Sequence, residues 1–153
     1  MKKFLFALGT AVATLQAEEP SRHFQQRVIA AVIWAEARSE GYDAMRAVAE
    51  VIRNRAYDRI QTVFEVVIAP KQFSCLNGTA PFRLAERMET ATGRDKLART
   101  FCEGLADLLL SGSFRDQRTH GATHFFDNSV FPDWAFDVPV LRINGLCFCK
   151  PEE

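Results

Sequence analysis

The sequence has no excess of charge of either sign, no internal repeat and no low-complexity segment. Lysine plus arginine and aspartate plus glutamate each total 19, so there is no long-range field to gather nucleic acid or anionic lipid. We therefore expect no nucleic acid partner. The 153 residues are 48% hydrophobic and 25% charged, which is the composition of one ordinary globular domain.

The chain also lacks an apolar run long enough to span a bilayer. The run from Phe4 to Leu15 is well short of the roughly 20 residues that a spanning helix needs. It follows two lysines and precedes small residues, which is the order of a secretory signal peptide. We predict a signal peptide over residues 1–17, cleaved after Ala13 or Ala17, and a folded domain over 22–150. The protein is then exported to the periplasm, cell envelope or medium, without stable membrane insertion.

Cysteine is scarce, with four residues that all follow the predicted signal peptide. An even count in an exported chain predicts disulfides. Cys147 and Cys149 are two positions apart and would face the same side of a strand. We therefore expect one or both of them to pair with Cys75 or Cys102, with the connectivity left open.

Metal ligands at the usual spacings are missing. The Cys-x-Cys pair near the C-terminus has no second pair at zinc-ligand spacing. His120 and His124 are four apart with Asp127 nearby, but Gly121 indicates an extended segment, in which the two rings would not share a helical face. We predict no metal site and no cofactor.

Apolar residues recur at helical spacing from Phe24 to Arg38, which predicts a first helix with one buried stripe. Gly41 is placed to close this helix as its left-handed C′ residue. Asp43 is placed as the N-cap of a second helix. We expect the helices to pack together through two stripes: Val28, Ile29, Val32, Ile33, Glu36 and Ala37, and Ala44, Ala47, Val48, Val51 and Ile52.

Three further helices are predicted. Thr62-Val63-Phe64-Glu65 has the capping-box form and opens a short helix that stops near Ala69, because Pro70 disfavours helix in the residue before it. Longer helical stretches run from about Phe82 to Thr90 and from Asp95 to Leu110. The last of these carries one apolar face, formed by Leu97, Ala98, Phe101, Leu105, Leu108 and Leu109.

The pattern changes in the last forty or so residues. Thr123 to Phe126 has the composition of a strand, and Val138 to Ile143 and Leu146 to Cys149 are predicted strands joined by Asn144-Gly145. Asn-Gly between apolar runs is the strongest short hairpin signal. We therefore predict an α+β, mainly α domain with a small antiparallel sheet near the C-terminus.

Glu36 is the most informative position, because it continues the apolar stripe four residues after Val32, at the C-terminal end of the first helix. Desolvation there and the negative end of the helix dipole both favour a protonated carboxyl. A neutral carboxylic acid is the proton donor that a glycosidic oxygen needs. From periodicity alone, an equal alternative is an ion pair with Arg38, Arg53 or Arg55.

Four ordered blocks resemble the spore-cortex-lytic (SleB-like) cell wall hydrolases. The first is Trp34 to Gly41 followed by Ala47 to Arg55; the others are Pro70 to Cys75, Gly121 to Phe125 and Pro132 to Ala135. Together they make the resemblance specific, and it extends from about Ile29 to Phe148. It implies a lysozyme-like fold related to lytic transglycosylases. It also implies that the first glutamate of Glu-Ala-Arg, here Glu36, is the catalytic acid and that the substrate is peptidoglycan.

Seven residues within or beside these blocks are candidates for binding sugar. Gln72 and Ser74 offer an amide and a hydroxyl beside an aromatic ring, although Phe73 could be a core anchor in an ordinary loop. His124 could orient substrate or Glu36, or it could be a structural histidine. Trp134 could stack on a sugar ring or fill a core. The full set is Gln72, Phe73, Ser74, Thr123, His124, Asn128 and Trp134.

The resemblance favours a lytic transglycosylase that cuts the β-1,4 bond after N-acetylmuramic acid and leaves 1,6-anhydro ends. In that reaction Glu36 is first acid and then base. We expect the enzyme to act as a monomer. A muramidase-type hydrolase would need a second carboxylate, for which Asp127, Asp133 and Asp137 are available. Two alternatives of other classes are a secreted module that binds glycan without cutting it and a peptidase with Cys75 as nucleophile and His124 as base.

Overall fold

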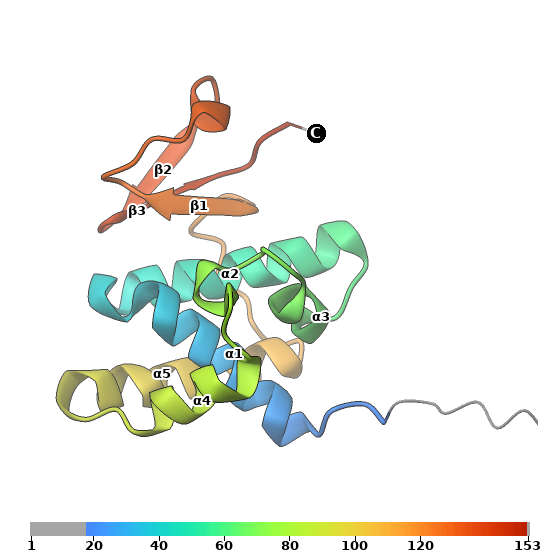
Figure 1. Cartoon of the computed structure of the whole chain (residues 1–153). Coiled ribbons are helices and arrows are strands. Elements are labelled where there is room, and N and C mark those ends of the chain that lie inside the picture. Colours follow the sequence, from blue (N-terminus) through green and yellow to red (C-terminus); the bar gives the residue numbers. More distant parts are fainter. Residues whose placement is uncertain (1–17, 153) are drawn as a thin grey trace, which may run out of the picture.

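The computed structural model describes residues 18–152, which form five α-helices and a three-stranded sheet (Figure 1). The protein is thus α+β and mainly helical, as predicted. The predicted signal peptide, residues 1–17, lies outside the described residues. The helices are α1 (Arg22–Ala37), α2 (Tyr42–Arg59), α3 (Val63–Ile68), α4 (Pro81–Glu89) and α5 (Gly93–Leu110); short 3₁₀ helices are η1 (Arg38–Glu40), η2 (Ser74–Leu76) and η3 (Asp133–Ala135).

Helix α1 is the centre of the core. Every residue from Val28 to Trp34 is buried, because α1 packs against all four of the other helices. A helix that is apolar on all sides belongs in a core, so the sequence prediction of a single buried stripe was too narrow. Among residues 18–152, no helix combines the length and apolar character needed to cross a bilayer.

The junction between α1 and α2 differs from the prediction. Helix α1 ends at Ala37 and continues as η1, and Gly41, with a φ of 88°, precedes α2 as its N-cap. Gly41 thus has the positive φ expected of it, but it starts α2 and does not directly end α1. Asp43 is not the N-cap; it lies in the first turn of α2 and forms an ion pair with Arg118 at 2.6 Å.

The remaining helices follow the prediction closely at their ends. Thr62 and Glu65 form the expected capping box of α3, and Ala69 before Pro70 is extended. The predicted face of α5 was partly wrong, because Leu97 is 61% and Leu108 43% exposed. The face that packs inward is rotated toward Ala98, Cys102, Leu105, Ala106 and Leu109.

The sheet consists of β1 (His124–Asp127), β2 (Val140–Ile143) and β3 (Leu146–Cys149), in the order β1-β3-β2 and antiparallel throughout. Strand β3 is central and fully buried. The predicted Asn144-Gly145 hairpin is confirmed, with a φ of 52° at Asn144. Strand β2 begins two residues later than predicted, directly after Pro139, because proline has no N–H to donate to the ladder. The sheet lies beside α2, on the opposite side from α4 and α5 (Figure 1).

Glu40 connects the hairpin to the end of the first helix. Its carboxylate accepts a hydrogen bond from the N–H of Gly145 at 2.9 Å, and its carbonyl accepts one from Asn144 Nδ2 at 2.6 Å. These two hydrogen bonds fix the sheet against the segment that carries Glu36. We call this contact the Glu40 clamp.

The predicted disulfides are wrong, since all four cysteines are free thiols in the structure. The cysteines occupy three separate places, η2, α5 and β3. Cys102 Sγ packs 3.3 Å from Met45 Sδ between α5 and α2, on the helical side of the molecule. Burial, followed by the charge of Glu103, raises the pKa of Cys102 to about 12, so this thiol behaves as a small core residue.

Candidate active site

Glu36 lies in the last turn of α1 and is half-buried. Its side chain borders a pocket of about 380 Å³ between the helices and the sheet. Loop 70–76 forms a third wall, since Pro70 ends the preceding helix and the chain then turns back toward α1. The lining residues are Glu36, Arg55, Gln72, Phe73, Ser74, Phe125, Phe126, Asp127 and Leu146.

The carboxylate of Glu36 is held by neutral donors. The N–H of Cys75 donates to Oε1 at 3.1 Å, and the Ser74 hydroxyl donates to Oε1 at 3.2 Å and reaches Oε2 at 3.5 Å. None of the ion pairs among residues 18–152 includes Glu36. Oε1 is therefore held by two donors, whereas Oε2 makes one longer contact among the described residues.

The alternative interpretation of Glu36 was an ion pair with Arg38, Arg53 or Arg55. No such pair forms among residues 18–152. Arg38 pairs with Asp95 at 3.4 Å and lies over the Trp34 ring. Arg53 lies 3.7 Å from the carboxylate of Glu50. Arg55 donates to backbone carbonyls, as described next. Each of the three candidate arginines is thus engaged elsewhere.

Arg55 holds the walls of the pocket together. Its Nε donates to the carbonyl of Thr123 at 2.6 Å and its Nη1 to the carbonyl of Gln72 at 3.1 Å, while the guanidinium lies over the Phe73 ring. Burial and the charge of Arg59 lower the pKa of Arg55 to about 10, against the opposing charge of Glu36. Sequence reasoning missed this role. The signal was present, because Arg55 continues the buried stripe of α2 after Ile52, just as Glu36 does in α1.

The three loop candidates, Gln72, Phe73 and Ser74, all line the Glu36 pocket but make different contacts there. Ser74 contacts the carboxylate directly. Gln72 lines the pocket, and its Oε1 accepts from Arg59 Nη1 at 2.7 Å. Phe73 also lines the pocket but is only 2% exposed and packs against Phe125. That placement fits the alternative of a core anchor.

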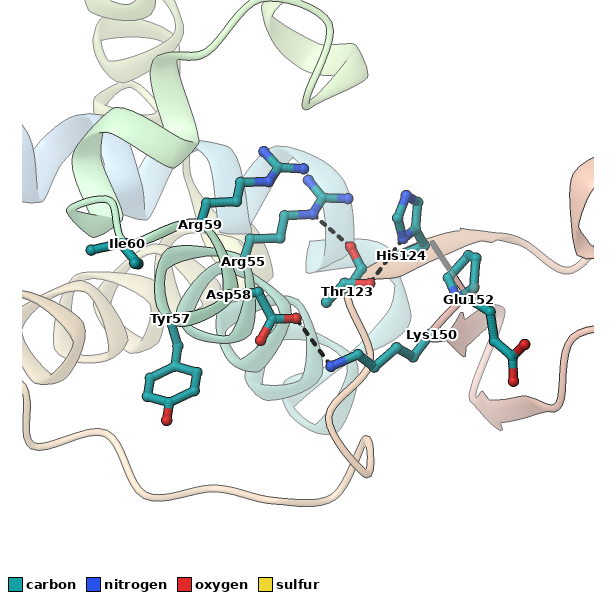
Figure 2. Close-up of a pocket in the computed structure, with 10 residues that line it drawn as sticks. Arg55, Tyr57, Asp58, Arg59, Ile60, Thr123, His124, Lys150 and Glu152 are labelled. Atoms are coloured by element: carbon teal, nitrogen blue, oxygen red, sulfur yellow. Dashed lines mark hydrogen bonds and ion pairs between the residues drawn. The ribbon is translucent and has the colours of Figure 1, made fainter.

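Thr123 and His124 line a second pocket of about 990 Å³, which shares Arg55 with the first (Figure 2). The Thr123 hydroxyl and His124 Nδ1 are 3.0 Å apart. The ring of His124 is 5.4 Å from that of Trp134, which is 50% exposed. Asn128 is exposed beyond the end of β1 and lines neither pocket. The structure therefore divides five of the seven candidates between two adjoining pockets and leaves Asn128 and Trp134 outside both.

Comparison with known proteins adds one finding. Residues 39–149 match the family model described as Cell Wall Hydrolase. The chain belongs to this family. Membership makes it a peptidoglycan-degrading enzyme. Neither the curated proteins nor the solved structures give a significant match, so the likeness to lysozyme stays a prediction. Glu36 lies just before the matched residues, and its role is likewise a prediction.

The pocket of this cell wall hydrolase contains a second carboxylate. Asp127, at the end of β1, is exposed and lines the same pocket as Glu36. Hydrogen bonds from Ser129, including its N–H at 2.8 Å, lower the pKa of Asp127, so it is ionised. Asp133 and Asp137 line neither of the two pockets. The sequence could not separate the three, because the choice depends on how the sheet is placed.

The peptidase alternative finds no support in the geometry. Burial and the neighbouring Glu36 raise the pKa of Cys75, which disfavours the thiolate that a nucleophile needs. His124 contacts Thr123 and Trp134. No group of three or more potential metal ligands occurs among residues 18–152.

Proposed function

We propose that this protein cuts the glycan strands of peptidoglycan at the β-1,4 bond after N-acetylmuramic acid, with Glu36 as the proton donor. Membership of the cell wall hydrolase family supports the substrate. The observation that carries the role of Glu36 is its carboxylate, held by Ser74 and Cys75 at a pocket and free of any ion pair among the described residues.

Neutral donors suit a group that must change its protonation state twice in one cycle. An arginine partner would add a full positive charge and hold the carboxyl ionised, whereas a hydroxyl and an amide N–H restrain Oε1 and bring no net charge. In the first step neutral Glu36 gives its proton from Oε2 to the leaving glycosidic oxygen as the bond to C1 breaks. The sugar then carries oxocarbenium-like charge, and Glu36 is a carboxylate.

The second step defines the product. As a lytic transglycosylase, the enzyme uses the Glu36 carboxylate to remove the proton from the 6-hydroxyl of the same sugar, whose oxygen bonds to C1. Glu36 regains its proton, no water is consumed, and a 1,6-anhydro end is formed. This route needs one carboxylate only, and it is the reaction that the resemblance favours.

A second candidate is hydrolysis, favoured by the position of Asp127 on the same pocket. An ionised carboxylate across the pocket from the acid is the arrangement that hydrolytic glycosidases use, either as nucleophile or as base for water. Under this alternative, Asp127 assists attack on C1, and the product carries a free reducing end.

Purified peptidoglycan distinguishes these possibilities. Glu36→Gln should abolish solubilisation of the wall, while Glu103→Gln, the same change on α5 away from the pocket, should retain it. Mass spectrometry of wild-type products then separates anhydro ends from hydrolytic ends, which are heavier by one water. Undiminished digestion by Glu36→Gln would overturn the proposal. Hydrolytic ends that disappear in Asp127→Asn would replace the first mechanism with the second.

A further inference from the structure

Three basic side chains meet where the two pockets adjoin. Arg55 lines both pockets, and Arg59 and His124 line the larger one. Figure 2 shows the guanidinium groups of Arg55 and Arg59 side by side, near the ring of His124. Burial, then the charges of Arg55 and Arg59, lower the pKa of His124. The three groups therefore act on one another electrostatically. We call them the basic cluster.

Among the residues that the structure describes, no carboxylate forms an ion pair with Arg55 or Arg59, although the charge of Glu36 acts on Arg55 from the neighbouring pocket. Of the two acidic residues that line the same pocket, Asp58 pairs with Lys150 at 3.0 Å. The carboxylate of Glu152 is directed away from the guanidinium groups (Figure 2). The charge of Arg55 is costly to bury at 6% exposure and is only partly offset by Glu36, while Arg59 is exposed beside it.

The hydrogen bonds of the cluster orient the two arginines without neutralising them. Arg55 donates to the backbone carbonyls of Thr123 and Gln72. Arg59 uses only Nη1, which donates to Gln72 Oε1 at 2.7 Å. A guanidinium has five N–H donors in a planar fork that fits a carboxylate. The rest of the Arg59 fork faces the pocket without a partner among residues 18–152.

We propose that Arg59, with Arg55 and His124 beside it, binds a carboxylate of the peptidoglycan strand next to the bond being cut. This inference rests on the proposed function, which supplies the substrate. Peptidoglycan carries carboxylates in two places: on the lactyl group of muramic acid where no stem peptide is attached, and on the stem peptide where one is. Either source presents the same chemistry to the cluster. The glycan itself would occupy the Glu36 pocket, and Arg55 links the two.

The test compares strands that carry different carboxylates with strands whose carboxylates have been removed. Three soluble substrates are needed: strands with stem peptides, strands stripped of peptides by an amidase, and stripped strands whose carboxyl groups are converted to amides. Arg59→Gln should raise KM about tenfold for a carboxylate-bearing strand, since one charge-assisted hydrogen bond is lost. The value of kcat, and the KM for the amidated strand, should not change. Arg59→Lys should give an intermediate KM. Arg94→Gln, an exposed arginine of α5, is the matched control.

The pattern across the three substrates identifies the source of the carboxylate. An effect on stripped strands alone assigns the lactyl group, and an effect on peptide-bearing strands alone assigns the stem peptide. An equal rise in KM for charged and amidated strands, or no rise at all, overturns the inference. Dissociation constants measured in the Glu36→Gln background keep the test independent of cleavage. If wild-type protein cuts strands and Arg59→Gln binds them equally well, this inference fails while the proposed function stands.

Discussion

Glu36 and Glu50 lie on the adjacent helices α1 and α2, and their carboxylates have opposite surroundings. Glu50 is fully buried; its Oε2 accepts from the N–H of Thr119 at 3.0 Å, and its Oε1 lies 3.7 Å from Arg53. Glu36 borders a pocket and has only neutral partners. We infer from this difference that the two glutamates serve different purposes. A carboxylate closed off with a cation fixes structure, whereas an unpaired one at a pocket can exchange a proton.

The region around Glu50 extends into a network that fastens segment 114–119 to α2. Arg53 donates to the carbonyl of Asp116 at 2.6 Å, and Arg46 pairs with the carboxylate of Asp116 at 2.7 Å. The Thr119 N–H completes the attachment through Glu50. Segment 114–119, which this network holds in place, belongs to the connection between α5 and β1. We therefore assign it to stability and the Glu36 region to chemistry, and four predictions test that division.

The largest effect is expected for activity when Glu36 is replaced. Glu36→Gln removes the acid but keeps the size of the side chain, so digestion of peptidoglycan should fall roughly a thousandfold. The free energy of unfolding should change by less than about 0.5 kcal/mol, because no ion pair is lost. Release of soluble fragments and urea denaturation measure the two quantities. A large loss of stability would place Glu36 in the same class as Glu50.

Glu50→Gln should show the reverse pattern. The substitution leaves Arg53 without its nearby charge in the interior and weakens the acceptor for the Thr119 N–H, at an expected cost of about 3 kcal/mol. Digestion measured well below the melting temperature should stay within about twofold of wild type. Arg142→Gln, on the exposed side of β2, controls for loss of a charge. If activity falls while stability is retained, the proposed division is wrong.

Ser74→Ala sharpens the description of Glu36, because it removes one of the two donors to the carboxylate. The loss of one hydrogen bond to a charged group predicts a fall of about tenfold in kcat, with KM nearly unchanged. Ser111→Ala at the end of α5 is the control. Combining Ser74→Ala with Glu36→Gln should add almost nothing further to the loss, since both changes act on the same group.

The smallest effect is a pH dependence that belongs to the Glu50 region. Although burial alone raises the pKa of Asp116, hydrogen bonds from Arg46 and Arg118 lower it overall. Its folded pKa is then below its unfolded pKa, so its stabilisation is present above the unfolded value and lost as pH falls through the folded value. Between about pH 5 and pH 3, wild type should lose more stability than Asp116→Asn. Equal losses in the two melting curves would contradict this.

Local patterns in the sequence predicted most of the fold. The capping box at Thr62, the break before Pro70 and the Asn144-Gly145 turn each depend on neighbouring residues only. The errors concern contacts between distant segments. The disulfides were inferred from a count, the burial of α1 on all sides depends on four other helices, and the exposed side of α5 depends on its orientation against α1.

The same distinction applies to the site. Glu36 was selected as the candidate acid because a carboxylate interrupts an apolar stripe, which is a local signal. Arg55 carried the same signal, yet its partners, the carbonyls of Thr123 and Gln72, are set by the approach of the loop and the sheet. Asp127 could not be chosen over Asp133 and Asp137 for the same reason. Sequence patterns therefore identified an unusual residue, while the identity of its neighbours required the structure.

The Glu40 clamp has a consequence for the order in which the enzyme matures. It joins positions more than one hundred residues apart, and the pocket itself combines Glu36 with Leu146 from the opposite end of the domain. Contacts of such wide sequence separation form late in folding. A chain still emerging from the ribosome has its glutamate early but gains the opposite wall only with its last strands. The pocket beside Glu36 is thus complete only when synthesis is nearly finished.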